Sequence, residues 1–278
     1  MLPSRSSDAI SPTAHYTGFI WAKNGLSHPE LETVEGRVLY EAVRPAMVLS
    51  SALGSGTLEA YLMARHQAID SLLTRAIDES GITQVLEVAT GLSPRGWRFT
   101  EKYGERLTYV EADLPAMAAR KRRALERMGS LSERHRVLDI DVLRDGGPDS
   151  LASVIEGLDH GAGLAIITEG LLGYLPTDAV QGIWRRFAAA LSSFERGRYI
   201  AELHLSSIQT PVIRAFRLVL SGFVRGRVYL HYATEAEARA ALEAAGFRSV
   251  SIELATDLVP GESAAGSRLV HIIEASTA

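Results

Sequence analysis

Residues 84–113 place the tightest constraint on how this chain of 278 residues folds. Residues 85–88 form a short apolar run rich in β-branched side chains, which is typical of a buried strand, and a turn containing Gly91 follows at once. Ser93 offers an N-cap oxygen, and Pro94 suits the first position of a helix because its missing N–H is not needed there. The stretch therefore predicts a strand, a glycine turn and a helix that begins at Pro94.

A second predicted strand, residues 107–110, leads to the acids Glu111 and Asp113. A strand, glycine turn, helix, strand and acid in this order form the nucleotide half-site of a doubly wound sheet. In such a half-site the turn lets a ligand approach the backbone near Gly91, and the acid accepts hydrogen bonds from ribose hydroxyls.

The turn itself indicates which nucleotide is bound. A dinucleotide site has G-x-G-x-x-G, because a pyrophosphate must lie on bare backbone, but here Ala89 stands at the first glycine and Pro94 at the third. A phosphate is therefore disfavoured. A ligand with adenosine but no phosphate, such as S-adenosylmethionine, needs only a close approach near Gly91 and an acid for its ribose. The alternative, equally open at this point, is that Gly91 only closes a strand-to-helix turn in an enzyme whose active site lies elsewhere.

Composition narrows the class of protein. The apolar content of 46% supports a full core, and a net charge of −4 with a pI of about 6.1 favours neither nucleic acid nor an anionic membrane as a partner. The chain has no cysteine, which excludes disulfides and thiolate metal ligands, and no metal site is expected. Neither a signal peptide nor an apolar run of about 18 residues is evident. These features predict a soluble cytoplasmic protein of unspecified oligomeric state.

The first part of the chain is predicted to be helical. Residues 1–14 form a loose polar arm, and residues 16–52 form short helices with breaks at His28-Pro29 and Arg44-Pro45. Residues 57–78 have apolar side chains at helical spacing and form one amphipathic helix. Arg65 lies close to its apolar stripe, and by itself is best interpreted as reaching solvent.

Strands and helices alternate after the half-site. A helix over 115–128 carries the only basic cluster, which includes Lys121 and is interpreted as a solvated face rather than a nucleic-acid site. The further strands are predicted at 136–140, 164–167, 199–203, 250–254 and 269–273, the last two separated by Pro260-Gly261 in a hairpin-like ending. Thr234 and Glu237 form a capping box for a helix that ends at Gly246. Alternation of this kind predicts an α/β fold, a doubly wound, Rossmann-like sheet of seven mostly parallel strands.

Four segments of one domain are expected, with an N-terminal helical cap over 1–80, a core over 81–204, an insertion over 205–233, and a final helix and strand pair over 234–278. The insertion is apolar and studded with arginines. It is either a lid over the strand ends or an ordinary crossover. Ligands of such sheets bind outside the carboxyl ends of the strands.

Five motifs in order carry a resemblance to a known family. They are YLMARHQAID (61–70), EVATGLSPRGWRF (87–99), VEADLPAMAARKR (110–122), DIDVLRD (139–145) and TEGLLGYLP (168–176). Over about residues 61–191 the chain resembles the leucine carboxyl methyltransferase family, which includes bacterial O-methyltransferases of polyketide biosynthesis. The resemblance implies the class I S-adenosylmethionine fold with extra N-terminal helices and a substrate-covering insertion.

By position, the resemblance implies a set of cofactor-binding residues, namely Arg65, Glu87, Ala89, Gly91, Glu111, Asp113, Asp141, Val142 and Glu169. Arg65 matches the arginine that pairs with the cofactor carboxylate, which replaces its solvent-facing interpretation. Asp113 matches the acid that holds the ribose, Asp141 and Val142 the adenine contacts, and Glu169 the acid near the methionine amino group. The family's turn usually reads Gly-x-Gly, so Ala89 is a departure, acceptable if its φ is negative.

The implied chemistry is methyl transfer from S-adenosylmethionine, with S-adenosylhomocysteine as product, to a small-molecule acceptor, and a polyketide-like secondary metabolite is expected. A carboxylate acceptor is already ionised and needs no base, whereas a phenol or alcohol needs one, for which His204 is the candidate. Tyr174 would orient the acceptor oxygen, and Tyr16 and Trp21 would help to line its pocket. The alternatives are methylation of a protein C-terminal carboxylate and a module that only binds S-adenosylmethionine. An oxidoreductase requires tighter binding of a nicotinamide dinucleotide.

Overall fold

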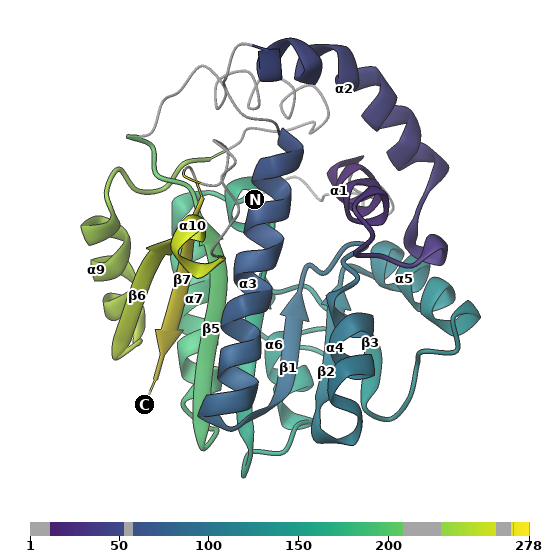
Figure 1. Cartoon of the computed structure of the whole chain (residues 1–278). Helices are drawn as coiled ribbons and strands as arrows, with labels where there is room; N and C mark the ends of the chain where they lie inside the picture. The colour runs from purple at the N-terminus through teal and green to yellow at the C-terminus, as the bar shows by residue number, and fades with distance from the viewer. Residues whose placement is uncertain (1–11, 53–57, 208–228, 260–267, 269, 278) are drawn as a thin grey trace.

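The fold is a single seven-stranded sheet with helices on both faces (Figure 1). The computed structural model describes residues 12–52, 58–207, 229–259, 268 and 270–277. The strands are β1 (Ile82–Val88), β2 (Thr108–Asp113), β3 (His135–Asp139), β4 (Gly163–Thr168), β5 (Arg196–Leu203), β6 (Ser249–Leu254) and β7 (His271–Ser276). They lie in the order β3-β2-β1-β4-β5-β7-β6, and β7 runs antiparallel to both of its neighbours. The predicted α/β class, strand number and mostly parallel sheet are confirmed.

Helices from different parts of the chain cover the two faces. On one face lie α3 (Leu58–Ser80), α4 (Arg95–Tyr103), α5 (Pro115–Arg127) and the short α10 (Ala255–Leu258), and on the other α6 (Leu151–Glu156), α7 (Thr177–Leu191) and α9 (Glu235–Ala245). The remaining α1 (Pro12–Lys23) and α2 (Val34–Ala52) lie beyond the end of the sheet toward which β1 points (Figure 1). Single 3-10 turns occur at η1 (Pro29–Leu31), η2 (Gly104–Arg106) and η3 (Leu172–Tyr174).

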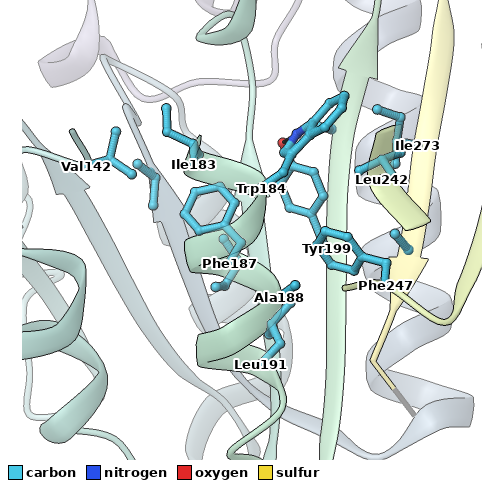
Figure 2. Close-up of a cluster of buried hydrophobic side chains, with 14 of the residues drawn as sticks. Val142, Ile183, Trp184, Phe187, Ala188, Leu191, Tyr199, Leu242, Phe247 and Ile273 are labelled. Carbon is cyan, nitrogen blue, oxygen red and sulfur yellow. Dashed lines mark hydrogen bonds between the residues drawn. The ribbon is translucent and has the colours of Figure 1, made fainter. Parts of the chain in front are cut away.

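The larger core cluster joins α7 to the sheet (Figure 2). Phe187 of α7 packs on Tyr199 of β5 with ring centroids 5.3 Å apart, and Phe247 packs on the same tyrosine at 5.7 Å. Trp184 Nε1 donates a hydrogen bond to the Tyr199 hydroxyl at 3.3 Å. Because side chains alternate along a strand, the neighbouring Ile200 faces α3 instead. Both faces of β5 are therefore buried, which fixes the end of this strand firmly.

Several local predictions are wrong. Pro45 lies inside α2 rather than ending a helix, and because it is exposed, water can bond the carbonyl that its missing N–H leaves free. Helix α4 begins at Arg95, one residue later than predicted, although the Ser93 hydroxyl does accept a hydrogen bond from the Arg95 N–H at 3.3 Å. The predicted hairpin between β6 and β7 contains α10.

Other predictions fall partly outside the described residues. The predicted arm ends earlier than expected because α1 begins at Pro12, and residues 1–11 lie outside the description. Residues 208–228 of the predicted insertion lie outside it too, but the two ends meet after β5, where the Ser206 N–H donates to the Tyr232 carbonyl at 2.8 Å. A lid role for 205–233 stays a prediction. Among the helices in the described ranges, none combines the length and apolarity that crossing a membrane requires.

Candidate active site

The turn after β1 lies between two acids at the carboxyl edge of the sheet. Val88, the last residue of β1, is opposite Ala112 of β2 on one side and Thr168 of β4 on the other. Asp113, the last residue of β2, and Glu169, the residue after β4, therefore lie at one edge of the sheet. This edge, together with Arg65 and Gly91, is called the rim below.

Asp113 holds the turn on the β2 side of the rim. Its Oδ2 accepts a hydrogen bond from the Gly91 N–H at 2.7 Å, and its Oδ1 accepts one from the Leu114 N–H at 2.7 Å. Burial raises the pKa of Asp113 to about 6, although these two hydrogen bonds act in the opposite direction. The carboxyl group is thus mostly ionised at neutral pH and lies beside the Gly91 turn, and its role toward a ribose stays a prediction.

Arg65 and Glu169 form the other side of the rim. Arg65 is buried, and its Nε donates to Glu169 Oε1 at 2.9 Å. Burial raises the pKa of Glu169, but the charges of His66, Arg95 and Arg65 outweigh it and hold that pKa well below its usual range. The Glu169 carboxylate and the Arg65 guanidinium therefore lie side by side beyond the end of β4.

Arg95 connects the turn to both of its neighbours. Its side chain is fully buried and donates to Asp70 Oδ1, Glu87 Oε1 and Glu169 Oε2, each at 2.6 Å. The three carboxylates come from α3, β1 and the end of β4, so one guanidinium joins three elements. Arg95 lies within one of the five motifs, but no role is predicted for it from the sequence, because no local pattern indicates that three distant acids converge on it.

Glu111 lies beneath the turn, not on the rim. Its side chain is fully buried, Oε2 accepts from the Thr90 hydroxyl at 2.8 Å, and Oε1 lies 2.7 Å from His135 Nε2. Lys121, predicted to be solvated, is instead fully buried in contact with Glu111, and its Nζ donates to the Ser93 carbonyl at 2.7 Å. Full burial and bonds to both oxygens place Glu111 as a support beneath the turn, and its contact with the cofactor stays a prediction.

Glu87 is occupied in the same way. It is 1% exposed, its Oε1 accepts from Arg95, and its Oε2 accepts from the Tyr109 hydroxyl at 2.7 Å. Both of its oxygens therefore face protein donors, and Glu87 also supports the turn from below.

Ala89 departs from the expected backbone. Its φ is +57°, in the left-handed region, so the negative φ expected for an alanine at this position is wrong. This conformation costs an alanine about 1–2 kcal/mol relative to its preferred regions. The glycine usual in the family at this place thus has a physical reason, and the chain keeps the turn despite the strain.

Replacing Ala89 with glycine is expected to raise the free energy of unfolding by about 1 kcal/mol, because glycine adopts positive φ without strain. Urea denaturation followed by circular dichroism measures the change. The matched control is Gly91→Ala, which is expected to destabilise: Gly91 has φ of +54°, and an added Cβ would lie 3.3 Å from Ala14 Cβ. Equal effects of the two changes would contradict the assigned turn geometry.

Helix α1 covers the turn from above, and two predicted acceptor-pocket residues lie near it. The Tyr174 hydroxyl donates to Thr13 Oγ1 at 3.0 Å, and the Trp21 ring lies 4.8 Å from the His66 ring, centroid to centroid. Trp21 Nε1 is buried and has no hydrogen-bond partner in the described structure. Tyr16 instead packs within the helical cap against Tyr40 at 6.4 Å. Their role toward an acceptor stays a prediction.

His204, the predicted base, follows β5 and is hydrogen-bonded through Nε2 to the Tyr61 hydroxyl. Burial, aided by the charges of His271 and His231, lowers the pKa of His204 to about 4. The ring is therefore neutral at physiological pH, and its Nε2 is already engaged in one hydrogen bond. Both facts make it a weak base.

The predicted adenine contacts follow β3. Asp141 Oδ1 accepts from the Leu143 N–H at 3.1 Å, which shapes the loop, and Val142 packs into the core cluster shown in Figure 2. Their adenine role stays a prediction. Across the described ranges, no three or more His, Asp or Glu side chains are grouped so as to hold a metal ion.

A known protein family matches the sequence of this chain over more than half of its length. The family described as "Leucine carboxyl methyltransferase" matches residues 33–188. The chain belongs to this family. The resemblance inferred from the five motifs is thus confirmed, and the match extends it into the helical cap.

Individual relatives agree with the family. A protein of Mycolicibacterium gilvum (strain PYR-GCK), named as a candidate S-adenosyl-L-methionine-dependent methyltransferase, is 34% identical over 129 residues, which are 46% of this chain and 40% of that protein. The chain spans less than half the length of the curated relatives it matches.

Solved structures share the fold. A candidate methyltransferase from Thermobifida fusca has a TM-score of 0.68 at 14% identity, covering 99% of this chain and 98% of that one. The structure of PigF with SAH has a TM-score of 0.52 at 20% identity, covering 74% and 53%. With the strand order β3-β2-β1-β4-β5-β7-β6, this likeness confirms the class I methyltransferase fold.

Proposed function

We propose that this protein is an S-adenosylmethionine-dependent O-methyltransferase acting on a carboxylate or hydroxyl oxygen of a small molecule. The observation that carries the proposal is the rim, where the Gly91–Asp113 pair and the Arg65–Glu169 pair lie at the carboxyl ends of adjacent strands. Membership of the leucine carboxyl methyltransferase family supports it, as does the shared fold of a structure that holds SAH.

The residues present fit the cofactor chemically. Asp113 offers an ionised carboxylate to ribose hydroxyls, Arg65 offers a cation to a carboxylate, and Glu169 offers an anion to an ammonium group. Gly91 and Gly170 both have positive φ and present bare backbone at the two sides of the rim. A phosphate would meet Asp113 and Glu169 as like charges, so the donor set favours a phosphate-free nucleoside.

Positioning is the main task left to the protein. When bound, S-adenosylmethionine supplies an electrophilic methyl group on a sulfonium. The ion pairs beneath the turn fix Gly91 and Asp113, and α1 covers the turn, which together hold the reactants in place and exclude water.

Calorimetry and methyl transfer test the proposal together. We expect S-adenosylhomocysteine and S-adenosylmethionine to bind at least about tenfold, or 1.4 kcal/mol, more tightly than NAD. Label from [methyl-³H]S-adenosylmethionine should then appear on members of a panel of phenols and small carboxylic acids. Tighter binding of NAD would refute the donor assignment.

The same assay separates the alternatives. Labelling confined to peptides with a free C-terminal leucine carboxylate would indicate a protein methyltransferase. Bound S-adenosylmethionine that never turns over to S-adenosylhomocysteine with any acceptor would indicate a binding module.

A further inference from the structure

Glu202 of β5 is a buried acid that the family comparison leaves without a role. It follows Ala201, which is opposite Thr168 of β4, so Glu202 lies beside Glu169 at the rim. The side chain is 2% exposed, and its Oε1 accepts a hydrogen bond from the Gly170 N–H at 2.8 Å. Its Oε2 is buried with no hydrogen-bond partner among the described residues. A carboxylate oxygen in this state is unfavourable unless a proton or a ligand donor reaches it.

The titratable groups that act on Glu202 come from α3, from the segment after β4 that includes η3, and from its own strand β5. The charge of Arg65 on α3 favours the ionised form of Glu202, but the Arg65 Nε is already bonded to Glu169, and the Glu169 carboxylate repels a second anion. Tyr174 of η3 and Tyr199 of β5 are the neighbouring phenols. Burial raises the pKa of Glu202 to about 7, while the charge of Arg65 acts against this rise.

A group that titrates near the working pH is matched to general-base catalysis. His204, two residues further along, has a pKa lowered to about 4 and is bonded to Tyr61, so Glu202 is the stronger base at this edge.

We propose that Glu202 accepts the proton of the methyl acceptor through its unpartnered Oε2, and that the acceptor is therefore a hydroxyl compound, a phenol or alcohol, rather than a carboxylate. This inference rests on the proposed function. It narrows that function, because the proposed function alone allows either kind of oxygen.

The transfer step balances in atoms and charge. The acceptor oxygen forms a bond to the methyl carbon as the carbon–sulfur bond breaks, and the electron pair of that bond stays on sulfur. The acceptor proton moves to Glu202, which changes from a carboxylate to a neutral acid while the sulfonium becomes a neutral thioether. A carboxylate acceptor has no proton to give and would face both Glu202 and Glu169 as like charges.

Ligand binding to the protein saturated with S-adenosylhomocysteine tests the acceptor class without turnover. The probes are 4-fluorophenol and 4-fluorobenzoate, followed by ¹⁹F NMR at pH 8, where Glu202 is mostly ionised. We expect 4-fluorophenol to be retained at least tenfold more strongly than 4-fluorobenzoate. Glu202→Gln should reduce this ratio to about threefold or less, because it keeps the oxygen that bonds Gly170 and replaces the free acceptor with an NH₂ group.

Glu274→Gln is the matched control, since this glutamate on the neighbouring β7 pairs with Arg75 at an exposed position. It should leave the ratio unchanged. Three results would overturn the assignment of Glu202 as the base for a hydroxyl acceptor. They are a preference for 4-fluorobenzoate, a binding ratio that Glu202→Gln does not alter, and retention of neither probe.

Turnover supplies a second readout. With 4-fluorophenol and labelled S-adenosylmethionine, kcat should rise with pH through about 7 in the wild type, and Glu202→Gln should lose this rise together with 10²–10⁴-fold of kcat. Methylation of benzoate alone would overturn the role of Glu202 but leave the proposed function intact. Absence of S-adenosylhomocysteine binding would instead defeat the proposed function, so the two failures are distinguishable.

Discussion

Replacing Arg95 with methionine is expected to lower the free energy of unfolding by about 3–5 kcal/mol at pH 7. Methionine fills much of the same space but leaves Asp70, Glu87 and Glu169 without the guanidinium that joins them. Glu87 is 1% exposed and is left with a buried, unpaired charge. A buried carboxylate without a partner cation is costly, so the loss in the free energy of unfolding should lie at the upper end of this range.

Thermal and urea unfolding measure the effect, and the midpoint temperature should fall by on the order of 10 °C. The matched control is Arg98→Ala, also on α4, where the arginine pairs with Asp70 Oδ2 at 2.7 Å but its side chain is 32% exposed. Solvent screening limits that pair to less than about 1 kcal/mol. A loss for Arg95→Met no larger than for Arg98→Ala would show that the buried carboxylates find other partners.

Replacing Asp113 with asparagine is expected to weaken S-adenosylhomocysteine binding about 10- to 100-fold, because charge-assisted hydrogen bonds to the ribose contribute about 1.5–3 kcal/mol. Calorimetry at pH 7.5 measures the dissociation constants. Folding should be affected less than binding, because asparagine loses one of the two hydrogen bonds from the Gly91 and Leu114 N–H groups but also removes the cost of ionising a buried carboxyl group whose pKa is raised to about 6. Because the pKa is raised in the folded protein, ionising Asp113 lowers the free energy of unfolding. This loss is absent at low pH and grows as pH rises from about 4 to 6, and a variant with an uncharged side chain does not incur it at neutral pH.

The pH dependence identifies Asp113 as the cause. Below about pH 6 the free protein protonates Asp113, and at pH 5 only about one tenth of the molecules retain the carboxylate. At pH 6 about half of the molecules carry the carboxylate, so the wild-type affinity should fall about fivefold between pH 6 and 5, and the asparagine variant should lose this part of the slope. An identical slope in both proteins would assign the titration to another group.

The sequence predicts the sheet well because its strands are short apolar runs with acids at their ends. The five motifs also located the rim, since Arg65, Gly91, Asp113 and Glu169 do meet at one edge. These features depend on local patterns and on order along the chain.

What the sequence missed depends on tertiary packing. Lys121 belongs to a basic run that is typical of a solvated helix face, yet it is fully buried on Glu111. Arg95 meets acids that are 8 to 74 residues away along the chain. The positive φ of Ala89 is hidden for another reason, because alanine rarely adopts it and nothing adjacent signals the strain.

The ion pairs of α3 also have a consequence for protein engineering. Arg65, His66 and Asp70 form ion pairs with Glu169 and Arg95 of the core. Helix α3 is therefore bonded to the core, although the sequence places it in the predicted helical cap. A graft that exchanges caps between relatives to change acceptor choice should therefore join the chains before Leu58 and keep α3 native. A chimera joined after Ser80 would exchange Arg65, His66 and Asp70, which leaves Glu169 and Arg95 of the core without these partners, and should be recovered mainly as insoluble protein.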